Sequence, residues 1–213
     1  MTLAHGTTQI ESPRLILRRV TPSDLAFYTR IHSLPQVARY LWPNGIPRTP
    51  QQTLVWLKSV LESYERLALG YLAVVRKADN ALIGRCGIME LATESAAPAQ
   101  RLRTGWFDDN LPPAGVSVIH ECELGYTFDP AVWGQGYAAE AASCVRDHAR
   151  DVLRLSYVIS AIHPENVRSQ RVASRWGARF EGRMEAHGMV WDRYVWPLLA
   201  TGGTLRPPKP SSR

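Results

Sequence analysis

The stretch that decides the fold runs from Glu123 to Glu140 and reads ELGYTFDPAVWGQGYAAE. Its first part alternates like a β-strand up to Asp129-Pro130, and its last part is rich in helix-forming residues. Between them, Gly134 and Gly136 form a turn that leads directly into the helix. Glycine lets the backbone approach a ligand closely, and the first turn of a helix offers unpaired N–H groups and the positive end of the dipole. The stretch therefore predicts a strand, a turn and a helix that together bind a pyrophosphate, with a purely structural tight turn as the alternative.

Two other phosphate-binding motifs do not fit this stretch. A dinucleotide-binding fingerprint needs a third glycine in an early βαβ unit, whereas Ala139 stands in that place and the motif lies late in the chain. A P-loop needs Gly-Lys followed by Ser or Thr, whereas Tyr137 follows Gly136. The turn is therefore assigned to neither class.

The rest of the chain predicts a mixed sheet with helices packed on it. Thr21-Pro22 and Thr49-Pro50 each place a capping residue before a proline, which is typical of a helix start. Asp79-Asn80 lies between two β-rich runs and predicts a hairpin turn. The expected strands are 15–20, 70–76, 81–89, 121–128, 157–162, 180–184 and 191–198, and the later expected helices are 138–153 and 166–176. The fold class is therefore α/β, or α+β, with about seven strands and about four flanking helices.

A single domain is expected over residues 13–199, since 213 residues are enough for one sizeable core. Residues 1–12 are expected to form a flexible N-terminus. Residues 92–118 lose all periodicity and are interpreted as a long loop. Residues 200–213 combine Gly, Pro and Ser with basic residues and are expected to form a disordered tail.

The composition narrows the class of protein. The formal net charge of +6 favours anionic partners, but the basic residues do not cluster as they do in nucleic-acid-binding proteins. Cys86, Cys122 and Cys144 are far apart and show no metal-ligand spacing, which is typical of reduced thiols in a cytoplasmic protein without a metal site. No apolar run approaches the ~20 residues that a membrane span requires.

Four motifs in chain order resemble the GNAT superfamily of N-acetyltransferases, in the branch typified by the ribosomal-protein N-terminal acetyltransferases RimJ and RimL. They are PRLILR at 13–18, WGQGYAAEA at 133–141, HPENVRSQRV at 163–172 followed by WGA at 176–178, and DRYV at 192–195. The wider superfamily begins its pyrophosphate loop with Arg or Gln, whereas this chain has Trp133, as the branch often allows. The resemblance implies a mostly antiparallel sheet splayed at a cofactor cleft, and transfer of an acetyl group from acetyl-CoA to a primary amine.

The resemblance also implies the residues of the site. Glu123 is the candidate general base, with Glu121 on the same face as the fallback and a surface carboxylate as the alternative reading. Ser169 is the candidate donor to the departing thiolate, and a backbone N–H within 126–128 is the candidate donor to the thioester oxygen. Asn166 is expected to hold the pantetheine arm and to cap its helix. The expected acetyl-CoA-binding residues are Tyr126, Thr127, Phe128, Trp133, Gly134, Gln135, Gly136, Tyr137, Ala138, Ala139, Asn166, Ser169 and Arg171.

The acceptor pocket is expected to be aromatic, because aromatic rings bind ammonium groups and hydrophobic substrates. Its candidates, for which core packing is the alternative, are Tyr40, Trp42, Trp106, Phe107, His187 and Trp191. The acceptor is left open between a protein N-terminal α-amino group, a lysine and a small-molecule amine. A non-catalytic acyl-CoA-binding or regulatory module on the same fold is the alternative function. Nucleic acid is expected only indirectly, through ribosomal proteins, and an exposed sheet edge would allow a homodimer.

Overall fold

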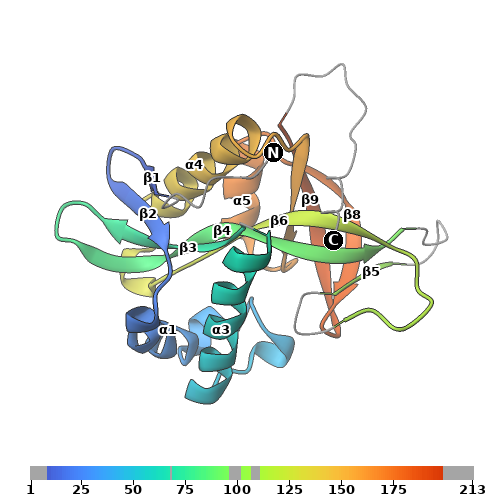
Figure 1. Ribbon diagram of the computed structural model, residues 1–213, viewed down its shortest axis with the longest axis horizontal. Coiled ribbons are helices and arrows are strands. Elements are labelled where there is room, and N and C mark those ends of the chain that lie inside the picture. The colour runs from blue at the N-terminus through green and yellow to red at the C-terminus, as the bar shows by residue number, and fades with distance from the viewer. Residues whose placement is uncertain (1–8, 68, 96–101, 107–110, 199–213) are drawn as a thin grey trace.

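The computed structural model describes residues 9–67, 69–95, 102–106 and 111–198, which form helices packed around one large sheet (Figure 1). The strands in these residues are β1 (Ile10–Glu11), β2 (Leu15–Arg19), β3 (Gly70–Arg76), β4 (Ala81–Glu94), β5 (Arg103–Trp106), β6 (Val118–Phe128), β7 (Tyr157–Ile162), β8 (Arg179–Ala186) and β9 (Met189–Pro197). The α-helices are α1 (Leu25–His32), α2 (Pro35–Ala38), α3 (Pro50–Leu67), α4 (Tyr137–Asp151) and α5 (Val167–Arg175). Short 3₁₀ turns are η1 (Pro22–Asp24), η2 (Pro43–Gly45) and η3 (Pro130–Val132).

The sheet is mostly antiparallel and follows the order β1-β2-β3-β4-β5-β8-β9-β7-β6. Only the pairs β5–β8 and β6–β7 run parallel among the described strands. Strand β4 also pairs with β6 along 84–94, so β4, β5, β8, β9, β7 and β6 form a closed cycle of pairings from which β1 to β3 extend. This mixed, mostly antiparallel sheet confirms the fold class that the sequence predicts.

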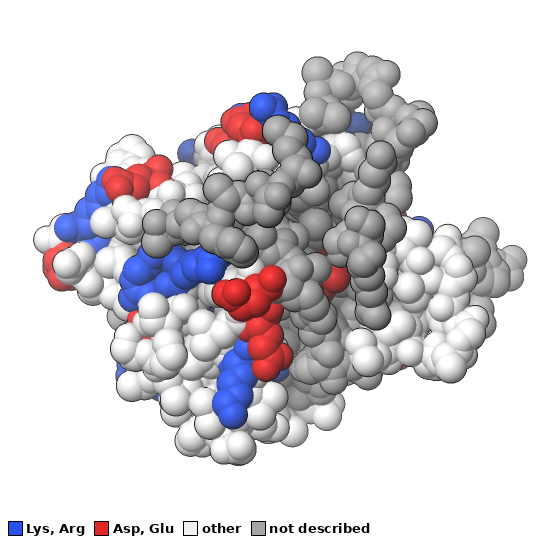
Figure 2. All heavy atoms as spheres, in the orientation of Figure 1, with Lys and Arg blue, Asp and Glu red and all other residues white. Residues whose placement is uncertain are grey.

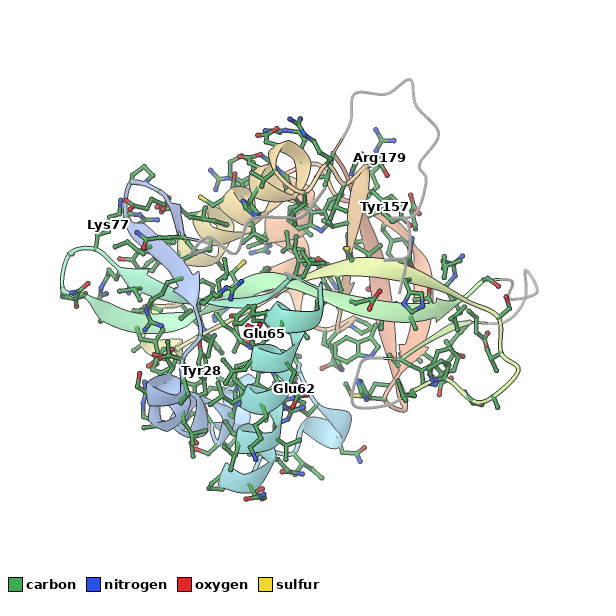
Figure 3. The ribbon with its side chains drawn as sticks, in the orientation of Figure 1. Tyr28, Glu62, Glu65, Lys77, Tyr157 and Arg179 are labelled. Atoms are coloured by element: carbon green, nitrogen blue, oxygen red, sulfur yellow. The ribbon has the colours of Figure 1, made fainter. Side chains whose placement is uncertain are left out.

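The helices cover the sheet from both sides. Figure 1 shows α4 on one side of the strands and α1 and α3 on the other. Tyr28 of α1 is fully buried below the sheet (Figure 3), and its ring packs edge-on against Trp56 of α3 at 4.8 Å between centroids. On the opposite side, the buried alanines Ala141, Ala142 and Ala149 of α4 allow that helix to lie close to the sheet.

The η1–α1 segment and helix α3 begin where their sequence signals at Thr21 and Thr49 indicate. The Thr49 backbone N–H donates to Gln52 Oε1 at 2.8 Å, and the Gln52 N–H donates to Thr49 Oγ1 at 3.2 Å, which is a capping box at the start of α3. The Thr21 N–H similarly donates to Asp24 Oδ2 at 2.8 Å, at the start of the η1–α1 segment. These caps confirm the predicted helix starts.

Two strands lie where the sequence predicts none, so the sheet has nine strands in the described residues instead of about seven. Strand β1 forms within the segment expected to be a flexible N-terminus, because Ile10 and Glu11 pair with β2. Strand β5 lies within the expected 92–118 loop, and β4 continues to Glu94. Strand β5 is held by pairing with β4 and β8, and the end of β4 by pairing with β6, which local periodicity does not reveal. The expected tail at 200–213 lies outside the described residues.

The face shown in Figure 2 has lysines and arginines in separate groups beside acidic residues. Lys77 Nζ lies 2.8 Å from Glu11 Oε2, and Arg76 Nη2 lies 2.6 Å from Asp79 Oδ2. These partly exposed ion pairs contribute little to stability, but they place negative charge beside basic side chains. In the described residues, no helix is long and apolar enough to cross a membrane, and no group of three or more His, Cys, Asp or Glu is arranged to hold a metal ion.

Candidate active site

The turn between β6 and α4 is an open glycine loop. Strand β6 ends at Phe128 and α4 begins at Tyr137. Gly134 and Gly136 have φ values of 79° and 82°, in the left-handed region that disfavours other residues. A Cβ atom on Gly134 would meet no atom within 4 Å, so that side of the loop faces space and is not packed against the protein. The first-turn N–H groups of α4 follow directly after this loop and have no intrahelical acceptors.

Residues from the start of the chain hold this loop in place. Arg14 donates from Nη1 to the Gln135 carbonyl oxygen at 3.0 Å and from Nε to Glu140 Oε2 at 2.7 Å. Ser12 Oγ donates to Glu140 Oε1 at 2.6 Å, and the Arg14 guanidinium lies 4.4 Å from the centre of the Tyr137 ring. The acidic residue in the first turn of α4 therefore connects the loop to the β1–β2 segment. The sequence motifs include both Arg14 and Glu140 but do not reveal this contact.

A cavity of about 680 Å³ adjoins the loop. We call it the larger cavity. The buried Thr127 Oγ1 has no hydrogen-bond partner among the described residues, and Arg168 lies over the Trp133 ring at 5.5 Å. All the predicted acetyl-CoA-binding residues line this cavity except Gln135 and Ser169; those that do are Tyr126, Thr127, Phe128, Trp133, Gly134, Gly136, Tyr137, Ala138, Ala139, Asn166 and Arg171. The structure thus brings together residues from β6, the loop, α4 and α5.

A second cavity of about 220 Å³, the smaller cavity, lies beside it. The two cavities adjoin at four residues that line both of them: Tyr40, Leu41, Tyr126 and Asn166. We call this place the passage. Tyr40 packs against His163 at 5.4 Å between ring centroids. This arrangement allows a long ligand in the larger cavity to present one end to a compact molecule in the smaller one.

The sheet opens at the point where the two cavities meet. Strand β6 pairs with β7 at the single position Glu123–Ile159, and no further β6–β7 pairing is present among the described residues. Beyond it, Ser160 Oγ donates to the Leu124 carbonyl oxygen at 2.6 Å and accepts from Trp196 Nε1 at 3.0 Å. Since a side chain satisfies this carbonyl in place of a strand partner, the edge of β6 after Glu123 is separated from β7. The splayed sheet that the resemblance implies is thus present.

Glu123 lies in the wall of the smaller cavity with 6% of its surface exposed. Tyr71 donates from its hydroxyl to Glu123 Oε2 at 3.2 Å. Burial raises the pKa of Glu123 to about 7, against the lowering effects of Arg85, the Tyr71 hydroxyl and the backbone N–H of Ala161. The expectation of a surface carboxylate is therefore wrong for Glu123. A carboxyl group with this pKa exchanges protons near neutral pH, as a general base must.

Glu121 lies on the same face of β6 but in different surroundings. It is 1% exposed and accepts hydrogen bonds from Thr93 Oγ1 at 2.9 Å, Tyr157 Oη at 3.1 Å and Arg193 Nη2 at 2.6 Å. Arg103 Nη1 also lies 3.6 Å from Glu121 Oε2. The surface reading is wrong here too. This carboxylate is occupied by structural partners and does not line either cavity.

The start of α5 places Asn166 and Ser169 at the passage. Asn166 Oδ1 accepts from the Ser169 backbone N–H at 3.2 Å, which confirms the predicted N-cap. Ser169 lines the smaller cavity, and its carbonyl accepts from the Tyr126 hydroxyl at 3.5 Å. The cap fixes the direction of the Asn166 side chain while leaving its amide N–H₂ group for a ligand.

The predicted acceptor residues separate into two groups. Tyr40, Trp42, His187 and Trp191 all line the smaller cavity. Trp106 lies on β5 opposite Ala92 and does not line it, and Phe107 lies outside the described residues.

Three further residues that the sequence does not single out also line the smaller cavity. Trp56 comes from α3, Tyr71 from β3 and Arg85 from β4. Their sequence segments read as ordinary helix and strand, so only the three-dimensional arrangement reveals them.

An open glycine loop at a helix start and two adjoining cavities can hold a phosphate-bearing ligand beside a second, smaller one. Residues 14–179 match the sequence model of the family described as "Acetyltransferase (GNAT) domain". The chain therefore belongs to the GNAT acetyltransferase family. It is an acetyltransferase, and its cofactor is acetyl-CoA, as in the rest of the family.

Known proteins similar to this chain come from several bacteria. The uncharacterized N-acetyltransferase YnaD of Bacillus subtilis is 32% identical over 84 residues, which cover 38% of this chain and 49% of YnaD, so the chain spans about half of that relative. The crystal structure of an acetyltransferase from Agrobacterium tumefaciens superposes with a TM-score of 0.67 and 23% identity, covering 92% of this chain and 98% of that one. The structure of Mycobacterium smegmatis RimJ in complex with CoA-disulfide has a TM-score of 0.60 and 18% identity, covering 89% and 84% of the chains. At these identities, the structures show a shared fold.

Proposed function

We propose that the protein transfers the acetyl group of acetyl-CoA directly to a primary amine, with Glu123 as the general base. The observation that carries this proposal is the buried Glu123 carboxylate in the wall of the smaller cavity, at the point where β6 and β7 part. An amine in the smaller cavity would lie between this carboxylate and the passage to the larger cavity. The non-catalytic alternative offers no reason to bury a carboxylate there.

The residues of the larger cavity fit coenzyme A. The loop around Gly134 faces open space, the buried Thr127 hydroxyl lacks a partner, and Arg168 and Arg171 lie in the cavity wall. We infer that the first-turn amides of α4 bind the diphosphate and that the two arginines add positive charge beside it. Bound acetyl-CoA supplies the activated thioester, and the remaining tasks belong to side chains and amides of the chain.

The first task is to remove a proton from the amine. An α-amino group with a pKa of ~7.7–8.0 costs about 1 to 1.4 kcal/mol to deprotonate at pH 7, whereas a lysine amine at ~10.4 costs about 4.6 kcal/mol. A Glu123 carboxyl with a pKa of about 7 is well matched to the first and poorly matched to the second. We therefore favour an α-amino group, or another amine of low pKa, as the acceptor.

Two further groups serve the thioester end of the reaction. The Ser169 hydroxyl, at the passage side of the smaller cavity, is the proposed donor to the departing sulfur. Backbone N–H groups between Tyr126 and Phe128, on the edge of β6 that has left β7, are the proposed donors to the thioester oxygen. The Asn166 amide is the proposed contact for the pantetheine arm.

We also infer that the chain belongs to the RimJ/RimL-like branch of the family. The four motifs support this, as does the distant structural likeness to RimJ of Mycobacterium smegmatis. Free thiols at Cys86, Cys122 and Cys144 support a cytoplasmic location, since a secreted protein of this kind would be expected to pair its cysteines.

Two measurements test the proposal. Titration calorimetry should show that coenzyme A binds, and thiol release from acetyl-CoA should accelerate with an amine in the assay, with mass spectrometry identifying the acetylated product. Binding without acceptor-dependent thiol release on any primary amine would favour the non-catalytic module. Absence of coenzyme A binding would overturn the whole assignment.

A further inference from the structure

Arg85 is a buried cation in the wall of the smaller cavity. It comes from β4, opposite Thr127 of β6 and Ala73 of β3, and 7% of its surface is exposed. Its position on a central strand gives it a fixed direction. Arginines are rarely buried unless a carboxylate or another acceptor pairs with them.

The protein satisfies the Arg85 guanidinium only in part, through a hydrogen bond with the Tyr71 hydroxyl. Its Nε and Nη1 atoms are buried without hydrogen-bond partners among the described residues. The Tyr71 ring lies 3.8 Å from the guanidinium carbon and the Trp56 ring 5.2 Å from it, so aromatic rings cover the flat faces of the group. The negative charge of Glu123 interacts favourably with Arg85, but no ion pair within 4 Å joins the two in the described part of the chain. Donors left unsatisfied in a buried site favour a ligand that supplies acceptors.

The charges around the smaller cavity favour an anion over a second cation. Arg48 also lines it, with its guanidinium 4.9 Å from the Trp42 ring. Glu123 is the only acidic residue among the described residues that line it. The buried His32, next to Trp42 and Trp56, has its pKa lowered to about 2 by burial and by Arg85 and Arg48, so it stays neutral. When Glu123 takes up a proton, the Arg85 guanidinium loses the negative charge that offsets it.

The size of the smaller cavity limits the ligand. Its volume of about 220 Å³ lies below the ~300–1,000 Å³ typical of pockets for drug-sized ligands. A compact molecule fits this space better than a peptide chain or a long polyamine. An acceptor of this size can reach Glu123 with one end and Arg85 with the other, since both side chains line the same cavity.

We propose that the acceptor is a small primary amine carrying an anionic oxygen group, a carboxylate or a phosphonate, which Arg85 binds while the amine faces Glu123. The inference rests on the proposed acetyl transfer and names its substrate class. In the reaction the nitrogen–carbon bond to the acetyl group forms as the carbon–sulfur bond breaks. The ammonium form first gives one proton to Glu123, which passes it to solvent. The attacking nitrogen then loses a second proton, the departing thiolate of coenzyme A gains one, and the anionic group is unchanged.

The test uses matched acceptors on the intact protein. The panel contains α-amino acids, the carboxamides of the same amino acids, the corresponding aminoalkylphosphonates, spermidine and a short peptide, each assayed for thiol release and for acetylated product. Because the anionic group raises the amine pKa above that of the carboxamide, kcat/KM is compared per neutral amine. On that basis we expect it to be at least tenfold higher for the acids or the phosphonates than for the carboxamides. The relative rates of the α-amino acids and the aminoalkylphosphonates show whether a carboxylate or a phosphonate is preferred.

A variant then assigns the preference to one side chain. Since Arg85 lowers the pKa of Glu123, the variant is compared with the wild type above that pKa, where Glu123 is deprotonated in both. There Arg85→Gln should lower kcat/KM at least tenfold more for the anionic acceptors than for the carboxamides, while coenzyme A affinity stays the same. Arg150→Gln, at the distant end of α4 where Arg150 pairs with Asp151, is the matched control and should change neither. Equal losses on both acceptor types would overturn the proposal and assign Arg85 a structural role.

The comparison of acceptors with the unmodified protein keeps the proposal testable if Arg85→Gln does not fold. Carboxamides, spermidine or the peptide reacting as well as the acids would overturn the anion preference and leave acetyl transfer standing. Coenzyme A binding with no reaction of any panel member would overturn the proposed substrate class. Failure of coenzyme A to bind would instead overturn the proposed function itself.

Discussion

The Arg14 guanidinium donates to the carbonyl oxygen of Gln135 at 3.0 Å, across 121 positions of the chain. The same side chain contacts Glu140 in the first turn of α4, so the residue just before β2 fixes both the loop and the helix start. Gly134 and Gly136 give the loop its open shape. Because glycine has many accessible backbone conformations, ordering the loop costs conformational entropy. A contact from outside the loop lowers that cost before any ligand arrives.

Replacing Arg14 with glutamine should therefore weaken coenzyme A binding. Arg14 is half exposed, with 47% of its side chain accessible, so we expect a loss of about 1 kcal/mol, or roughly fivefold in the dissociation constant. Titration calorimetry measures this directly, with Arg150→Gln as a control that removes an arginine of α4 without touching the loop. An unchanged dissociation constant would show that the loop is ordered without Arg14.

Removing the acidic group of Glu123 should slow turnover at least tenfold. The base must be deprotonated to accept a proton, so the wild-type rate should rise with pH through the Glu123 pKa of about 7 and level off above it. Glu123→Gln should lose this step in the pH profile while keeping its coenzyme A affinity. The check is kcat measured by thiol release across about pH 5.5 to 9. A wild-type rate in the variant at neutral pH would remove Glu123 from the mechanism.

The same substitution should stabilise the protein at high pH. The folded state raises the Glu123 pKa from 4.5 to about 7, so folding favours the protonated form and the free energy of unfolding falls as pH rises between these values. Above pH 7 the full penalty is present, about 3 kcal/mol as an upper bound. Glu123→Gln removes it, so melting temperatures by scanning calorimetry should rise at about pH 8.5 and change little at about pH 4.5. An equal change at both values would contradict the assignment of the buried charge.

Glu121→Gln should instead destabilise the folded protein. Glu121 is fully buried and pairs with Arg193 at 2.6 Å, so the substitution leaves the Arg193 guanidinium with only the more exposed Glu181, at 3.0 Å, as a counter-charge. We expect the free energy of unfolding to fall by about 3 kcal/mol, measured by denaturant titration. Protein that remains folded should keep its coenzyme A affinity, because Glu121 lines neither cavity. A variant as stable as wild type would show that the ion pair contributes nothing.

The different surroundings of Glu121 and Glu123 could not be predicted from the sequence. Both alternate onto one face of β6, and local pattern gives them equal standing. Arg193 and Tyr157, which occupy Glu121, come from β9 and β7, while Tyr71, which contacts Glu123, comes from β3. Partners this distant in the chain are fixed by strand pairing, and a single sequence carries no direct signal for it.

Features that depend on neighbouring residues were predictable. The caps at Thr49 and Asn166 and the left-handed glycines of the loop all follow from interactions within a few residues. Trp106 shows the reverse case. Its segment looks like an irregular loop, yet it pairs with β4 and β8 and so does not reach the smaller cavity.

The two roles proposed for Asn166 can be separated by choosing the replacement. Asparagine and aspartate cap helices about equally well, whereas alanine costs about 1 kcal/mol. Asn166→Asp should therefore keep the melting temperature of the wild type, because its carboxylate still accepts from the Ser169 N–H. Aspartate has no N–H₂ group to donate to the pantetheine arm and adds a negative charge at the passage. KM for acetyl-CoA should rise several-fold in Asn166→Asp and in Asn166→Ala, while only the alanine variant loses stability. If Asn166→Asp matches wild type in both KM and stability, Asn166 serves the helix alone, and the contact with the cofactor arm must come from another residue of the passage.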